Sequence, residues 1–84
     1  MEKADVFIQV SQILTAYLRL KPGDVRPESH VVRELGADSL ALVELGFKFM
    51  EAFGIGMIAP DDEFLVIDRL VDVIVEQMQS RVVR

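Results

Sequence analysis

Apolar residues recur every three or four positions in three separate segments of the chain, and this spacing restricts its possible folds. A helix has about 3.6 residues per turn, so such a stripe follows one helix face that must be buried. No segment alternates apolar and polar residues in the way that a half-buried strand does. We therefore predict an all-α fold whose helices share one core.

The first predicted helix covers about Ala4 to Leu20, and Lys21-Pro22-Gly23 should end it. Proline cannot continue the helical hydrogen bonds, and glycine accepts the left-handed turn that often follows a helix. Residues 24–37 are rich in turn formers and predict a long ordered loop. The apolar residues expected to anchor this loop to the core are Val25, Val31, Val32 and Leu35.

The second predicted helix begins at Asp38-Ser39, with Asp38 as its N-cap. One apolar strip comprises Leu40, Val43, Phe47 and Met50, and another comprises Leu42, Leu45, Phe49 and Phe53. Because apolar residues cover much of its circumference, this helix should be central in the fold. Its solvated side is marked by Glu44, Lys48 and Glu51.

Pro60 and the acids that follow it, Asp61, Asp62 and Glu63, predict the start of a short helix. Asp68 is the predicted N-cap of a last helix. The apolar positions of that helix are Ile67, Leu70, Val71, Ile74, Val75, Met78 and Val82. The expected fold is a small four-helix bundle, three main helices and one short one, forming a single domain over residues 1–84.

Composition argues against several classes of function. A chain of 84 residues has room for one modest core, which disfavours a deep catalytic cleft. Its apolar runs are far shorter than the roughly 20 residues that cross a bilayer. Asp5 interrupts any apolar leader, and cysteine is absent, so we expect a soluble protein of the reducing cytoplasm.

The charge distribution indicates the kind of partner to expect. The net charge is −5, which argues against nucleic acid as a ligand. Residues 33–76 hold ten acids and three bases, a balance of −7, whereas the remainder holds four acids and six bases, a balance of +2. An acidic surface of this kind steers basic protein surfaces toward itself.

The reactive side chains predict neither a catalytic residue nor a metal site. His30 has no nucleophile at a suitable spacing, so we assign it to the surface or to loop packing. The acids of residues 61–63 lack the alternating ligands and central glycine of a calcium loop. Ser39, taken by its position beside Asp38, would be an ordinary capping serine.

The segment Glu34-Leu35-Gly36-Ala37-Asp38-Ser39-Leu40, followed by Val43-Glu44-Leu45, changes this interpretation of Ser39. It resembles the phosphopantetheine attachment segment of acyl carrier proteins, and the order of elements resembles that family over most of the chain. The resemblance implies that Ser39 Oγ accepts 4'-phosphopantetheine from coenzyme A through a separate transferase. The thiol of this arm would then carry acyl groups as thioesters, while the chain itself catalyses nothing.

The resemblance also implies where partners bind. The family uses its second helix, which gives Leu40, Glu44 and Glu51 as contacts for enzymes with basic surfaces, and Asp38 as a neighbour of the transferase and its metal. A merely solvated helix face explains these acids equally well. An acyl chain could also enter the bundle, lined by Val43, Phe47 and Ile74, and we expect a monomer.

Three positions depart from bacterial fatty-acid carriers of this family. Ala41, Lys48 and Met50 stand where those carriers often have acids, which thins the negative face. The loop over residues 54–59 is also longer and more apolar than usual. These departures favour a carrier for a specialised lipid or polyketide pathway, with fatty-acid synthesis, a peptidyl or aminoacyl carrier and an unmodified helical adaptor as the alternatives.

Overall fold

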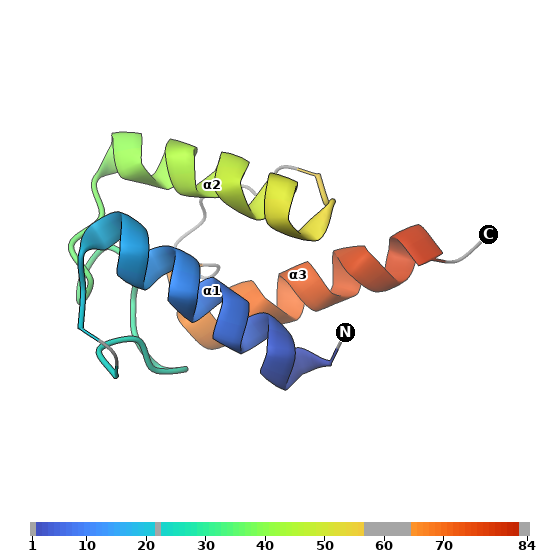
Figure 1. The fold of residues 1–84 in the computed structure, drawn as a ribbon, viewed down its shortest axis with the longest axis horizontal. Coiled ribbons are helices and arrows are strands. Elements are labelled where there is room, and N and C mark those ends of the chain that lie inside the picture. The colour runs from blue at the N-terminus through green and yellow to red at the C-terminus, as the bar shows by residue number, and fades with distance from the viewer. Residues whose placement is uncertain (1, 22, 57–64, 83–84) are drawn as a thin grey trace.

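The computed structural model describes residues 2–21, 23–56 and 65–82 of the chain. Within them lie three helices, α1 (Lys3–Leu18), α2 (Ser39–Phe53) and α3 (Ile67–Val82). α1 runs opposite to α2, so the end of α1 lies near the start of α2 (Figure 1). The predicted all-α fold is confirmed, whereas the short helix expected after Pro60 lies outside the described residues except at its end.

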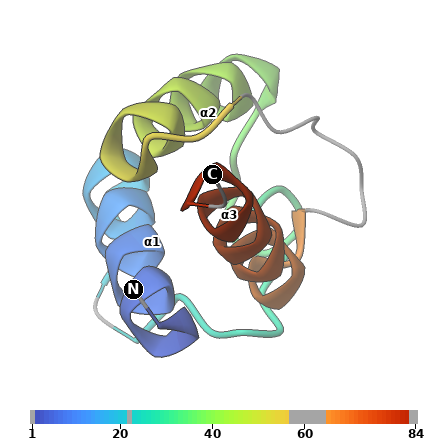
Figure 2. The same ribbon diagram turned by 90° about the vertical axis from the view of Figure 1, so that its right-hand side faces the viewer.

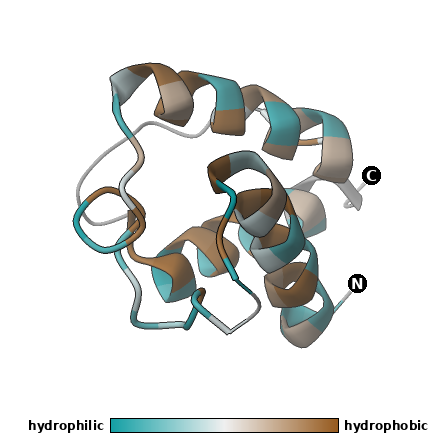
Figure 3. Cartoon of the chain, turned by 60° about the vertical axis from the view of Figure 1, so that its left-hand side comes forward, coloured by the Kyte–Doolittle hydropathy of each residue, from teal (hydrophilic) through white to brown (hydrophobic). Residues whose placement is uncertain are grey.

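The three helices surround a shared apolar interior (Figure 2). α1 packs most extensively against α3 and also contacts α2. Hydrophobic and hydrophilic bands alternate along the helices, as expected when each helix buries one face (Figure 3). The largest fully buried side chains come from all three helices and are Leu14, Leu45, Ile67 and Ile74. Burial of one such side chain contributes about 1.5–3 kcal/mol.

The end of α1 differs from the prediction. The helix ends at Leu18, and Arg19 adopts the left-handed conformation, with φ of 57°, that we expected of a glycine. The amides of Arg19 and Leu20 both donate to the carbonyl of Thr15. These bonds satisfy a carbonyl of the last turn, so Arg19 terminates the helix before the predicted stop signal.

α2 does not occupy the central position that we predicted. Its side chains Leu40, Val43 and Phe47 are 67%, 50% and 53% exposed. The buried residues of the helix are Ala41, Leu45, Phe49 and Phe53. Since α2 lies at the outside of the three-helix arrangement, it buries only one of its two apolar strips (Figure 2). The predicted solvated residues Glu44, Lys48 and Glu51 are exposed.

The start of α3 is held by backbone hydrogen bonds to the loop before α2. The amides of Ile67 and Asp68 donate to the carbonyls of Ser29 and Pro27, at 2.9 and 2.8 Å. Asp68 lies in the first helical turn, so its predicted role as N-cap is wrong. Its carboxylate instead lies 3.0 Å from Nζ of Lys3, on α1.

The loop over residues 24–37 is anchored much as expected. Val25, Val31 and Leu35 are buried, and Val32 is half-buried. His30 is 7% exposed, and its Nδ1 accepts hydrogen bonds from the amides of Val32 and Arg33 at 3.1 and 3.0 Å. Of the two roles predicted for His30, at the surface or in loop packing, the structure supports loop packing.

Candidate functional site

Ser39 is the first residue of α2, and Asp38, Ser39 and Leu40 are all exposed. Asp38 has an extended backbone, and its Oδ1 accepts a hydrogen bond from the amide of Ala41 at 2.8 Å. Asp38 is therefore the N-cap, as predicted. Because the carboxylate of Asp38 does the capping, the interpretation of Ser39 as the capping residue is wrong.

The residues before Ser39 fix where α2 begins. Leu35 and Ala37 are buried on either side of exposed Gly36, which adopts φ of 81°. The amide of Ala37 donates to the carbonyl of Val31 at 3.1 Å. A side chain at position 36 would strain this backbone, so glycine suits the Leu-Gly-Ala sequence for a physical reason. The turn thus anchors the chain two residues before the exposed serine.

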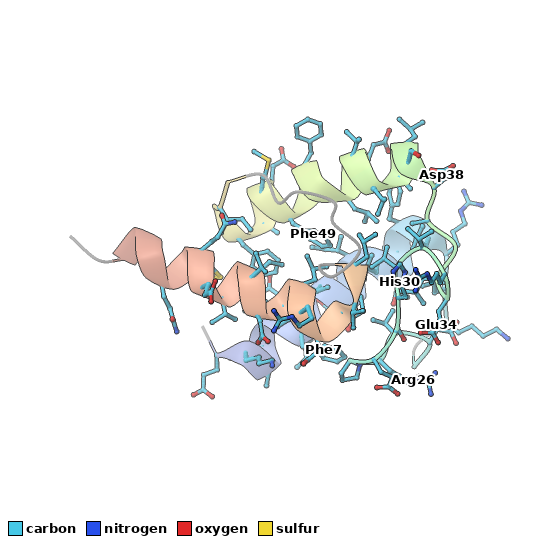
Figure 4. All side chains as sticks on the ribbon, turned by 180° about the vertical axis from the view of Figure 1, so that it is seen from behind. Phe7, Arg26, His30, Glu34, Asp38 and Phe49 are labelled. Carbon is cyan, nitrogen blue, oxygen red and sulfur yellow. The ribbon has the colours of Figure 1, made fainter. Side chains whose placement is uncertain are left out.

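The start of α2, where Ser39 lies, offers an environment suited to an attached phosphate. The start of α2 carries the positive end of the helix dipole and amides of the first turn, which favour negative charge. The exposed position leaves room for a long substituent. The single histidine of the chain, His30, is buried with Nδ1 engaged, although it lies toward the same end of the bundle as Asp38 (Figure 4). His30 therefore belongs to the packed loop and not to the exposed start of α2.

The predicted partner contacts Leu40, Glu44 and Glu51 all lie on the exposed part of α2, but their environments differ. Leu40 is largely solvated. The carboxylate of Glu44 accepts a hydrogen bond from the phenol of Tyr17, on α1. This bond raises the pKa of Tyr17 above its ordinary value, so the phenol remains a neutral donor at physiological pH.

Tyr17 and Lys48 lie beside Glu44 in contacts that the sequence did not predict. Nζ of Lys48 lies 5.5 Å from the centre of the Tyr17 ring, within the range of a cation–π contact. Tyr17 belongs to the apolar stripe that predicted the first helix, where it was indistinguishable from a core residue. The polar end of its ring was the available signal, because a tyrosine hydroxyl commonly reaches a hydrogen-bond partner.

The predicted lining of an interior acyl site is not brought together. Val43 and Phe47 are about half exposed at 50% and 53%, whereas Ile74 is fully buried. They therefore do not line one enclosed space. Labelled Phe49, on the opposite side of α2, points inward between the helices (Figure 4).

Two further expectations concern membranes and metals. Among the described residues, no helix combines the length and apolar character needed to cross a membrane. The same residues contain no group of three or more histidine or acidic side chains arranged to hold a metal ion. The acids of residues 61–63 lie outside the described part, so their helix-start role stays a prediction.

Comparison with known proteins places the site in context. The family model described as a phosphopantetheine attachment site matches residues 9–74, which include the loop, Ser39 and α2. An acyl carrier protein of Wolinella succinogenes is 36% identical over 69 residues, covering 82% of this chain and 88% of the relative. One of Campylobacter hominis is 39% identical over 59 residues, covering 70% and 72%. One of Rubrobacter xylanophilus is 34% identical over 83 residues, covering 95% and 100%.

Proposed function

Because this chain belongs to the acyl carrier protein family, with its phosphopantetheine attachment site, we propose that Ser39 carries the 4'-phosphopantetheine arm. The observation that carries this assignment is an exposed serine at the start of α2 whose capping role is taken by Asp38. The hydroxyl is thus accessible and not required by the fold. The arm supplies the thiol on which acyl intermediates travel as thioesters.

The attachment is a transfer of a phosphopantetheinyl group from coenzyme A. Ser39 Oγ forms a bond to phosphorus, the bond to the adenosine bisphosphate leaving group breaks, and a base on the transferase takes the serine proton. This chain contributes the positive end of α2, which favours the phosphodiester charge next to Ser39. Asp38 holds that helix end in place. Its exposure supports the proposal that it contacts the transferase and its metal.

Family membership implies contact with modifying and biosynthetic enzymes. We propose that these enzymes carry basic docking surfaces and bind α2 through Leu40, Glu44 and Glu51. The exposure of all three side chains supports this, as does the exposed apolar surface of Val43 and Phe47. Charge attraction raises encounter rates more than affinity, which suits a carrier that must leave each enzyme quickly.

The charge of α2 also bears on the pathway that this carrier serves. The exposed, basic Lys48 reduces the acidity of the exposed side of α2, whereas Ala41 is buried and Met50 half-buried and neither adds an acid there. This supports a specialised lipid or polyketide pathway over ordinary fatty-acid synthesis. We further propose that residues 1–84 act as one carrier domain, as a monomer in the cytoplasm. In this proposal, the chain performs no reaction of its own, since its carrier function needs only the attached arm.

Intact-protein mass spectrometry tests the attachment. The protein is incubated with coenzyme A, magnesium and a broad-specificity phosphopantetheinyl transferase, beside Ser39→Ala and the matched control Ser11→Ala. We expect one added phosphopantetheine in the parent and in Ser11→Ala, and none in Ser39→Ala. Circular dichroism verifies that each variant is folded. Addition to folded Ser39→Ala would place the arm elsewhere, and no addition with several transferases would favour the unmodified adaptor.

A further inference from the structure

Lys48 occupies the middle of the exposed acidic surface of α2. Glu44 lies four residues before it and Glu51 three residues after it, so both carboxylates are its neighbours on the helix surface. All three side chains are exposed. An ammonium group therefore lies within about one helical turn of each acid that a basic partner would contact.

Tyr17 keeps this arrangement ordered. Its ring lies under Nζ of Lys48 at 5.5 Å, and its hydroxyl donates to Glu44. The ring contact favours an ammonium position beside the junction of α1 and α2. Because this hydrogen bond occupies one oxygen of the Glu44 carboxylate, that oxygen is less available to a partner. The surface that a partner meets is accordingly less negative than its two acids suggest.

Two shallow hollows meet at Lys48 and Glu51. The first, about 530 Å³, lies between α1 and α2, with Ile13 and Ala16 on the α1 side. The second, about 400 Å³, follows α2 and includes Phe47. Lys48 and Glu51 line both hollows. A partner that places apolar side chains in the two hollows must therefore pass directly over these two charges.

We propose that Lys48 determines partner specificity, by favouring an enzyme surface that presents a carboxylate between apolar side chains and by repelling one that is wholly basic. The inference rests on the proposed function, because it requires docking through α2. A basic side chain that approaches Glu44 or Glu51 also approaches the Lys48 ammonium, at a cost in free energy. A carboxylate at that point gains a partner, and specificity commonly combines such attraction with repulsion of the wrong partner.

The test compares charge variants of the phosphopantetheine-bearing protein as malonyl acceptors. The probe enzyme is a malonyl transferase selected for a wholly basic docking surface, and malonyl-coenzyme A is the donor. The variants are Lys48→Glu and the neutral Lys48→Met. The control is Lys21→Glu, which makes the same charge change at an exposed residue outside the helices. Thermal unfolding establishes that all four proteins are folded.

We expect kcat/KM to rise about fivefold for Lys48→Glu and about twofold for Lys48→Met, with no comparable change for Lys21→Glu. High salt should reduce the gain. A transferase variant with one docking arginine replaced by glutamate should reverse the order, favouring the parent over Lys48→Glu.

Equal rates for the parent and Lys48→Glu would overturn the proposal, as would an equal gain in Lys21→Glu, which would reduce the effect to net charge. Retention of the original order with the transferase variant would also overturn it. Failure of the proposed function is distinguishable, because the parent would then gain no phosphopantetheine before any transfer is measured.

Discussion

The phenol of Tyr17 donates a hydrogen bond to the carboxylate of Glu44, joining the last turn of α1 to the exposed side of α2. This bond is the main cause of the raised pKa of Tyr17, because it favours the neutral phenol. Ionisation would remove the donor and place a phenolate beside a carboxylate. The bond therefore stabilises the fold only while Tyr17 is protonated.

Replacement of Tyr17 by phenylalanine should make stability less dependent on pH in the alkaline range. The pKa of Tyr17 is higher in the folded protein than in the unfolded chain, so its contribution is present below about pH 10 and declines as pH rises through the folded value. Thermal unfolding of the parent and Tyr17→Phe from about pH 8 to about pH 11 measures this. The parent should be more stable at the lower end, and the difference should shrink upward; a constant difference would contradict the assignment.

Asp38 should have separable roles in stability and in modification. Asp38→Ala removes the cap of α2 and should lower the free energy of unfolding by about 1 kcal/mol, whereas Asp38→Asn keeps a capping oxygen and should lose much less. Both variants lack the charge proposed to face the transferase, so both should acquire phosphopantetheine more slowly. Urea unfolding and timed mass spectrometry give the two readouts. If Asp38→Asn acquired phosphopantetheine at the parent's rate, the negative charge of Asp38 would not be needed by the transferase, and that part of the proposal would be wrong.

The start of α2 was predictable because its determinants are neighbours in the sequence. A capping aspartate followed by helix-forming residues acts over one turn, and the anchors Val25, Val31 and Leu35 stand out in a polar loop. The buried strip of α2 was harder to predict. Positions 40 and 45 are both leucine, so their side chains are equally hydrophobic. Only the positions of α1 and α3 determine that Leu45 is buried and Leu40 exposed.

The candidate site divides in the same way. Ser39 stands in a local motif and could be proposed from it. The hydrogen bond between Tyr17 and Glu44 joins residues 27 positions apart, on two helices, and no spacing rule within one element relates them. Lys48 meets Tyr17 only after α1 and α2 pack, so this contact could not be predicted from the sequence either.

Truncation of Phe49 should destabilise the fold far more than truncation of Phe47, although the two residues are only two positions apart. Phe49 is 5% exposed and Phe47 is 53% exposed. Phe49→Ala should cost about 3–5 kcal/mol in unfolding free energy, enough to unfold so small a domain. Phe47→Ala should change stability by less than about 0.5 kcal/mol.

Urea unfolding measures this pair, and the milder Phe→Leu changes keep the comparison possible if Phe49→Ala does not fold. Phe47→Ala should retain its phosphopantetheine attachment but dock less well with acyl-transferring enzymes, which a raised KM would reveal. Equal destabilisation at the two positions would contradict the exposed orientation of Phe47.

His30 should stabilise the turn before Ser39 through its role as an acceptor. Its Nδ1 accepts hydrogen bonds from the amides of Val32 and Arg33. His30→Ala removes the acceptor from a buried position and should cost about 1–3 kcal/mol. His30→Asn offers a side-chain carbonyl, which can accept from nearby amides as in turns and caps, and should recover part of the loss.

The loss in His30→Ala should be concentrated in the loop that leads to Ser39. The two hydrogen bonds to Nδ1 fix the beginning of the turn that leads to Ala37. The middle of α3 is instead stabilised by its own hydrogen bonds and packing. Amide hydrogen exchange should therefore accelerate over residues 31–37 more than in α3, and His30→Asn should restore part of the protection. Equal acceleration of exchange throughout the chain would instead mean that His30 contributes only to global stability and does not stabilise residues 31–37 in particular.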